Sequence, residues 1–142
     1  MSAYEPALFP NQGRSNIPGK QTFHLEVTYG SSAIASARGR NLAVEDTATG
    51  KMTVTFPRTY ARITGFRWGW VKCAAGAVYY PVILTNSIDT AGASGGGSVI
   101  IETRTEAGTA TDPASGDKLV LEFDVSNDDL AQSGDSITVT TP

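Results

Sequence analysis

The sequence predicts an all-β protein: an antiparallel two-sheet sandwich of the jelly-roll type, with an immunoglobulin-like sandwich as the second choice. Four stretches alternate between apolar and polar residues, which places successive side chains on opposite faces of a strand: 22–29, 51–56, 66–70 and 118–125. Fifteen glycines favour turns, and almost no segment has a helical period apart from a possible single turn at 127–132. The length of 142 residues fits one domain.

The expected strands follow one another with turn residues between them. Gly50 ends the turn at 46–50 and tolerates a left-handed backbone, whereas Pro81 requires an edge strand or a bulge because proline cannot donate to a ladder. Gly65 and Gly69 are expected bulge or bend points. We expect strands at 22–29, 41–45, 51–56, 61–73, 77–85, 98–105, 118–126 and 136–141, with a loop or weak edge strand at 30–39. Their shared core is expected to contain Phe23, Leu25, Val27, Leu119, Leu121, Phe123 and Val125.

Residues 1–21 differ in composition from the predicted sandwich at 22–142. Three prolines oppose a helix or a central strand in this segment, yet it carries large apolar residues that a solvated tail does not need. We therefore expect an extended N-terminal arm whose apolar side chains bind a partner, and the alternative is a frayed terminus. The expected anchors are Tyr4, Leu8, Phe9 and Ile17.

Charge is unevenly distributed along the chain. Residues 1–72 hold nine Lys or Arg and four Asp or Glu, whereas residues 73–142 hold two and ten. Interleaved strands would cancel this difference, and otherwise the protein would have a basic and an acidic pole. We expect no nucleic-acid partner, because the basic half lacks a dense Lys/Arg stripe. With one cysteine and no signal-like or membrane-spanning stretch, we expect folding in a reducing cytoplasm.

Three groups of residues are candidates for a catalytic or metal site. Gly92, Ser94 and Gly96 match a nucleophile pattern, but no strand–turn–helix context is expected there and His24 is the only histidine. His24 itself has no Cys or His companions for zinc, so we expect a surface histidine. The acidic group at 124–129 has oxygen ligands suited to calcium without the spacing of an EF-hand, and a solvated turn is expected. We therefore predict no catalytic residues, no metal and no cofactor.

Aromatic and basic residues share the segment 58–72. Phe66, Trp68 and Trp70 have the same parity; they either fill the core, which we expect, or form an exposed row that stacks sugars. Arg62 and Arg67 have opposite parity, so they do not form one phosphate-binding row. We expect at least one basic residue here to meet a carboxylate of a partner or of the acidic half of the chain. The candidates are Arg58, Arg62 and Arg67.

Three phrases, MTVTFPRTYARITGFRWGW, VYYPVILTN and SGDKLVLEFDVSN, resemble the jelly-roll cement or decoration proteins of short-tailed bacteriophages. The resemblance covers about residues 22–127. It implies a virion protein that is made in the host cytoplasm, binds the outer capsid surface and ties together major capsid protein subunits. It also implies a homo-oligomer, with a dimer favoured and a trimer possible, and no membrane partner. The rival hypothesis is a carbohydrate-binding sandwich that uses Trp68 and Trp70.

Overall fold

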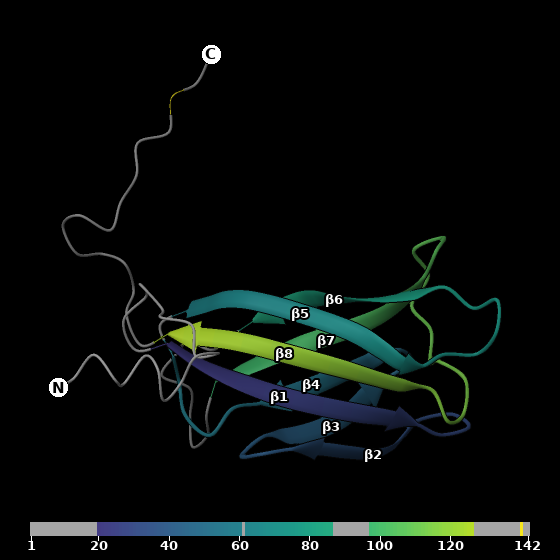
Figure 1. Cartoon of the computed structure of the whole chain (residues 1–142), viewed down its shortest axis with the longest axis horizontal. Coiled ribbons are helices and arrows are strands. Elements are labelled where there is room, and N and C mark those ends of the chain that lie inside the picture. The colour runs from purple at the N-terminus through teal and green to yellow at the C-terminus, as the bar shows by residue number, and fades with distance from the viewer. Residues whose placement is uncertain (1–19, 61, 87–96, 127–139, 141–142) are drawn as a thin grey trace, which may run out of the picture.

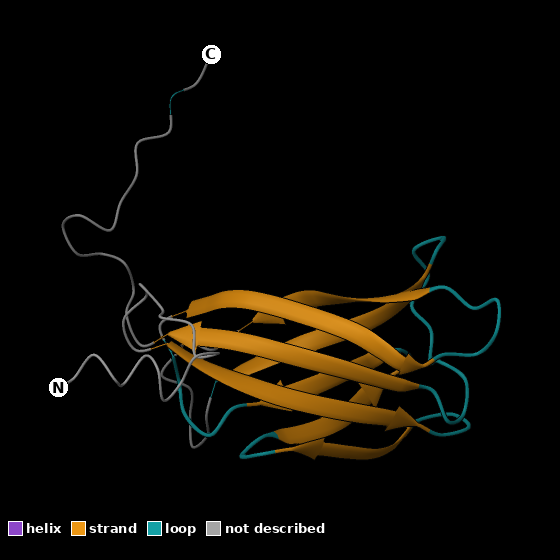
Figure 2. Ribbon diagram, in the orientation of Figure 1, coloured by secondary structure: helices purple, strands orange, loops and turns teal. Residues whose placement is uncertain are grey.

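The computed structural model describes residues 20–60, 62–86, 97–126 and 140. All of the regular structure in these residues is β-strand (Figure 2). The strands are β1 Lys20–Tyr29, β2 Ile34–Gly39, β3 Ala43–Ala48, β4 Lys51–Thr55, β5 Arg62–Lys72, β6 Tyr79–Asn86, β7 Ser98–Thr105 and β8 Lys118–Ser126.

The eight strands form two four-stranded sheets that pack face to face (Figure 1). The first sheet has the order β2-β1-β8-β5 and the second has the order β3-β4-β7-β6. Every pair is antiparallel, and β1 pairs with β8 from Lys20 opposite Ser126 to Thr28 opposite Lys118. The predicted antiparallel two-sheet sandwich is confirmed.

Several strand boundaries differ from those that the sequence predicts. β1 begins at Lys20, so the last two residues of the expected arm belong to a strand. The weak edge strand expected within 30–39 is present as β2. The strand expected at 41–45 begins instead at Ala43, because Asn41 adopts a left-handed backbone with φ of 60°. Thr140 lies outside any strand, and the rest of the expected strand at 136–141 and the helical turn at 127–132 lie outside the described residues.

The core lies between the two sheets and is formed by alternate residues of their strands. Leu25 and Val27 of β1 and the four predicted residues of β8 are almost fully buried, as expected, whereas Phe23 is only partly buried at the end of the core. Phe123 is at its centre, with ring-centroid distances of 5.5 Å to Phe56 and 5.3 Å to Phe66. Large aromatic side chains therefore contribute much of the buried apolar surface.

Prolines and glycines take the positions that their backbones allow. Pro81 lies in β6, which is an edge strand, as predicted. Gly50 has a φ of 69° in the β3–β4 turn, and a Cβ there would lie 2.7 Å from the backbone nitrogen of Thr111. The register of β5 shifts between Ile63 and Gly65, which places the expected bulge, but the second shift falls between Trp70 and Lys72 and not at Gly69.

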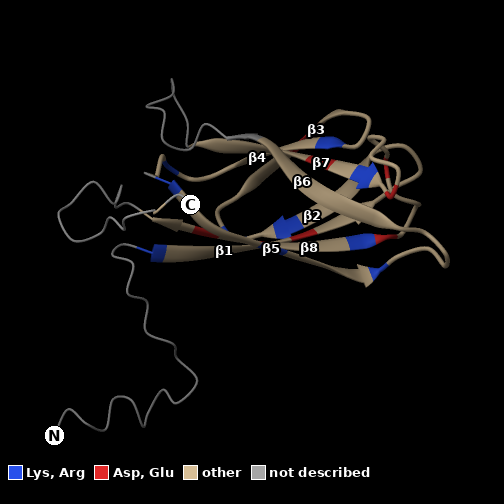
Figure 3. Cartoon of the chain, turned by 90° about the horizontal axis from the view of Figure 1, so that it is seen from above, with Lys and Arg blue, Asp and Glu red and all other residues tan. Residues whose placement is uncertain are grey.

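Strands from the basic and acidic parts of the chain alternate in the sandwich. β8, from the acidic part, lies between β1 and β5, and the two parts meet again where β4 pairs with β7. Basic and acidic positions are mixed along the described strands (Figure 3). Among the described residues, five ion pairs of Lys or Arg join the two parts of the chain: Lys20–Asp124, Arg67–Asp124, Arg67–Glu122, Lys51–Glu102 and Lys118–Glu26. Within the described strands, interleaving is therefore the arrangement that occurs.

Candidate functional site

The exposed large apolar side chains of the described residues lie along one lateral edge of the sandwich, where β5 and β6 end the two sheets. We call this surface the apolar edge. Its members keep 39–65% of their surface exposed: Trp68 45%, Val71 65%, Val78 54% and Leu84 39%. No further strand pairs with β5 or β6 on their outer sides among the described residues, so their backbones end the sheets here. Exposed apolar side chains beside an open strand edge are typical of a surface that binds another protein.

The three aromatic residues predicted to form one row on β5 do not share one environment. Phe66 and Trp70 pack against the core, as expected, and the indole nitrogen of Trp70 donates a hydrogen bond of 3.1 Å to the backbone oxygen of Tyr79. The expectation that Trp68 belongs to the core is wrong, because this side chain is nearly half exposed. Trp68 lines a shallow hollow of about 340 Å³ together with Arg67, Gly69 and Glu122.

A polar network covers the outer face of the first sheet, centred on Asp124. The guanidinium of Arg67 donates two hydrogen bonds to this carboxylate, at 2.6 and 3.0 Å, and a third of 2.9 Å to Glu122. Thr22 donates to Asp124 at 2.7 Å, and the Lys20 ammonium lies 3.4 Å away. We call these five residues the polar network. Its charged groups are satisfied by one another, so it braces β1, β8 and β5 across the sheet.

The polar network shifts the pKa values of its members in the directions that ion pairing requires. Hydrogen bonds from Arg67, with smaller ones from Thr22 and Lys20, hold the pKa of the Asp124 carboxyl well below its ordinary value, although burial opposes this. Arg67 likewise lowers the pKa of Glu122, and both carboxylates raise the pKa of Arg67. All three groups are therefore charged at neutral pH.

The three arginines, at least one of which is expected to meet a carboxylate, have different surroundings. Arg67 does meet carboxylates, and they belong to the acidic half of its own chain. Arg58 is exposed, with its guanidinium 5.2 Å from the centroid of the Tyr60 ring. Arg62 begins β5, and its nitrogens Nη1 and Nη2 are enclosed without a hydrogen-bond acceptor among the described residues. Contact of these residues with a partner stays a prediction, and Tyr4, Leu8, Phe9 and Ile17 lie outside the described residues.

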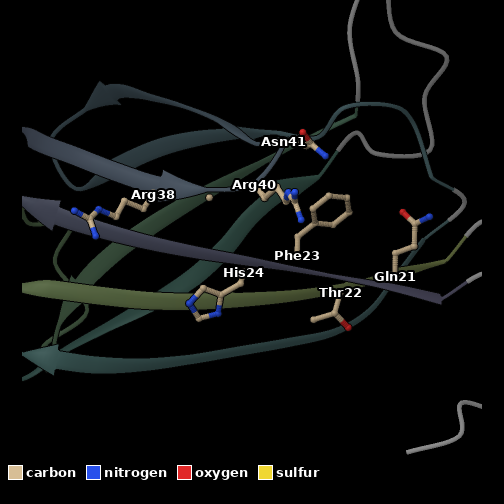
Figure 4. A pocket seen from close by; sticks show the side chains of 8 residues that line it. Gln21, Thr22, Phe23, His24, Arg38, Arg40 and Asn41 are labelled. Carbon is tan, nitrogen blue, oxygen red and sulfur yellow. The ribbon is translucent and has the colours of Figure 1, made fainter. Parts of the chain in front are cut away.

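A second hollow lies beside the first half of β1 and has a volume of about 670 Å³ (Figure 4). We call it the β1 hollow. Side chains from β1, from the end of β2 and from the turn that follows line it: Gln21, Thr22, Phe23, His24, Arg38, Arg40 and Asn41, with Gly39. Arg38 and Arg40 could not be singled out from the sequence, because neither belongs to a motif. The signal that could have found them is the pair of arginines flanking a glycine at the end of a short edge strand.

The other candidate groups do not form a reactive site in the described residues. His24 lies on the exposed outer face of β1, as expected, with its Nδ1 3.5 Å from Glu122. Asp124 already has partners in Arg67, Thr22 and Lys20, while Ser94 and residues 127–129 of the acidic group lie outside the described residues. Within 20–60, 62–86 and 97–126, no three His, Cys, Asp or Glu side chains are grouped as metal ligands.

A search of the described residues finds no helix long and apolar enough to cross a membrane. Comparison of the chain with protein-family models, with curated proteins and with solved structures finds no match.

Proposed function

We propose that this chain is a viral structural protein: a cement or decoration protein that binds the outer surface of a bacteriophage capsid and stabilises contacts between major capsid subunits. It acts by binding and not by catalysis. The cement-like phrases of β4–β5, β6 and β8 motivate the viral part of the proposal.

The apolar edge is the observation that carries this proposal. Four exposed apolar side chains gather on β5, on β6 and on the connection between them, where two backbone edges are also open. Protein interfaces combine an apolar centre with a polar rim, and Arg67 and Glu122 lie next to Trp68 to supply such a rim. A protein that binds only the assembled shell stabilises it by linkage, and many copies multiply a small contact.

The polar network supports a rigid binding surface. Arg67 and Asp124 are held by several short contacts between β5, β8 and β1, so the strand that carries the apolar edge is fixed to the centre of the sheet. A surface fixed in this way loses little conformational entropy when it binds.

The exposure of Trp68 favours a second candidate function, a carbohydrate-binding module. An indole beside an arginine and a carboxylate can stack a sugar ring and bind its hydroxyls, and the hollow at Trp68 offers all three groups. Trp70 would contribute less to such a site, because its indole nitrogen is already bonded to Tyr79.

Two lysine substitutions on the apolar edge test the main proposal. Purified protein is added to phage particles that lack it, and bound copies per particle and the melting temperature of the particles are measured. We expect Val71→Lys with Val78→Lys to lower occupancy about tenfold or more, because charge in the centre of an interface is costly. The matched control is Ala35→Lys with Ala37→Lys, which adds the same charge to exposed positions of β2. Equal occupancy of the test and control variants would refute the proposal.

The same particles separate the two candidate functions. Trp68→Ala is tested for capsid occupancy and on a glycan array. A loss of glycan binding with unchanged capsid binding would assign Trp68 to a sugar site and reject its role in the capsid contact.

The expected N-terminal anchors can be tested by deleting residues 2–19. The deletion stops before β1, so the sandwich should fold with an unchanged melting temperature. We expect lower retention on particles if Tyr4, Leu8, Phe9 and Ile17 bind the shell. Full retention would restrict the capsid contact to the sandwich.

A further inference from the structure

The edge opposite the apolar edge contains an incomplete strand pairing. On one side, β1 pairs with β8 from Lys20 to Thr28, but on its other side it pairs with β2 only from Leu25 to Tyr29. The chain leaves the sheet after Gly39, which is opposite Leu25, and turns at Asn41. Residues 20–24 of β1 therefore lack a neighbouring strand on the β2 side among the described residues. The β1 hollow occupies this position.

Apart from Phe23, the side chains around the β1 hollow are cationic or polar, with no Asp or Glu among them. Arg38 and Arg40 are exposed and make no ion pair or hydrogen bond with the described residues. Glu26 is opposite Arg38 in the register, but its carboxylate has the Lys118 ammonium 3.7 Å away. An approaching acidic group would therefore meet two guanidinium groups that have no partner to give up within the described part of the chain.

An aromatic surface lies between these polar groups. The ring of Phe23 lies beside Arg40 on one side of β1, whereas His24 and Thr22 project from the other side (Figure 4). The ring of Phe23 packs against the rings of Phe56 and Tyr60, at ring-centroid distances of 5.2 and 5.8 Å. A strand added beside residues 20–24 would therefore have an apolar contact on one of its faces and a polar contact on the other.

We propose that the β1 hollow accepts an extended acidic peptide segment of a partner protein, which adds as a strand beside residues 20–24. Its backbone pairs with the uncovered side of β1, and its acidic side chains meet Arg38 and Arg40. A strand beside five residues spans roughly 17 Å. A backbone edge, an apolar contact and cations at alternate positions are the features of recognition by strand addition, and a small anion would use only the cations.

This site lies across the sandwich from the apolar edge, because the first sheet runs in the order β2-β1-β8-β5. The chain then has two binding surfaces on opposite edges and can link two partners. Binding of a peptide in the β1 hollow does not require that the apolar edge binds a capsid.

The test uses a fluorescein-labelled nine-residue peptide of alternating glutamate and valine, with fluorescence anisotropy measured at low salt. We expect binding to the full chain, about tenfold or more weaker binding to Arg38→Glu with Arg40→Glu, and slower amide hydrogen exchange at residues 20–24 when the peptide is bound. The matched control is Lys72→Glu with Ala75→Glu and Ala107→Glu, which changes the net charge equally at exposed positions at and beyond the β5 and β7 ends, away from residues 20–24. This control should bind within about twofold of the parent.

Two further peptides separate strand addition from simple charge attraction. One replaces every glutamate by lysine, and the other replaces every second valine by proline, which removes backbone donors and keeps the acids. We expect neither to bind. Binding of the proline peptide as tightly as the parent peptide would overturn strand addition and leave only an anion-attracting surface. Failure of the glutamate–valine peptide to bind, or equal losses in the Arg38→Glu with Arg40→Glu variant and its charge-matched control, would overturn the site. A wild-type dimer that becomes monomeric in Arg38→Glu with Arg40→Glu would assign the site to a second copy instead of a different protein.

Discussion

The two lateral edges of this sandwich differ in the chemistry that they leave uncovered. At the β5–β6 edge, Trp68 and Val71 expose apolar surface, and Pro81 lies in the outermost strand of the second sheet. At the β2–β3 edge, the uncovered groups are the guanidiniums of Arg38 and Arg40. A backbone hydrogen bond from Ile34 to the Asp46 carboxylate, at 2.9 Å, joins the two strands there.

This difference shows that one core supports two unlike surfaces. Sheet edges are sites of association unless they are short, charged or covered. β2 is a six-residue strand with arginines near its end, so unselective pairing is discouraged while acidic segments are attracted. β5 is eleven residues long and exposes the apolar side chains of Trp68 and Val71, so it is better suited to a protein surface of matching shape than to an acidic segment. We therefore expect the two edges to bind different partners.

The largest expected effect tests whether both edges depend on the shared core. Phe123→Ala removes a fully buried ring that contacts Phe56 and Phe66 and should lower the free energy of unfolding by roughly 3–5 kcal/mol. Denaturant unfolding followed by tryptophan fluorescence measures the loss. Phe123→Leu is the control and should lose less, because it keeps more of the buried volume. A loss below about 1 kcal/mol for Phe123→Ala would contradict the central position of this ring.

The strands that form this core could be predicted because their alternation is strong. Leu121, Phe123 and Val125 alternate with Glu122 and Asp124, and each of the three is fully buried. The start of β3 could not be predicted in this way, because it depends on the left-handed backbone of Asn41, which leaves no apolar pattern. The order of the strands was also beyond reach, since pairing of β1 with β8 joins residues about a hundred positions apart.

An intermediate effect concerns the polar network, which joins the two edges across the first sheet. Because the pKa of Asp124 is lowered in the folded protein, its ionised form stabilises the fold at neutral pH. This contribution is present above the ordinary carboxyl pKa of about 4 and is lost as pH falls below it. We therefore expect the melting temperature to decrease from about pH 5 to pH 3, and Asp124→Asn to show a lower melting temperature at pH 7 with a weaker dependence on pH. Asp46→Asn, on the β2–β3 edge, is the control, and equal pH profiles for both variants would contradict this role.

The candidate sites were only partly accessible from the sequence. The sequence predicted that at least one basic residue of 58–72 meets a carboxylate, because charged residues on facing strands tend to pair, but it did not single out Arg67. Its partners Asp124 and Glu122 required the register of β5 against β8, which contains two shifts. The β1 hollow arises because β2 ends at Gly39 while β1 continues to Lys20, and the lengths of neighbouring strands do not follow from local patterns.

The smallest expected effect on stability separates two tryptophans of the same strand. Trp70 packs against Tyr29 and Tyr79, at ring-centroid distances of 6.4 and 5.8 Å, and its indole nitrogen is bonded. Trp70→Ala should therefore cost roughly 2–3 kcal/mol, somewhat below the loss for a fully buried aromatic residue. Trp68 is nearly half exposed, so Trp68→Ala should cost about 1 kcal/mol or less.

The binding effects of the two tryptophans should have the opposite order. Trp68 is exposed on the apolar edge, so its loss removes surface that a partner would bury, whereas the loss of Trp70 acts mainly through the fold. Denaturant unfolding and particle binding of Trp68→Ala and Trp70→Phe together measure this, since the phenylalanine keeps most of the packing. If Trp68→Ala lost more stability than Trp70→Ala, Trp68 would belong to the core. If it bound particles as well as the parent protein, Trp68 would have no role in the capsid contact, and the apolar edge would lose its largest member.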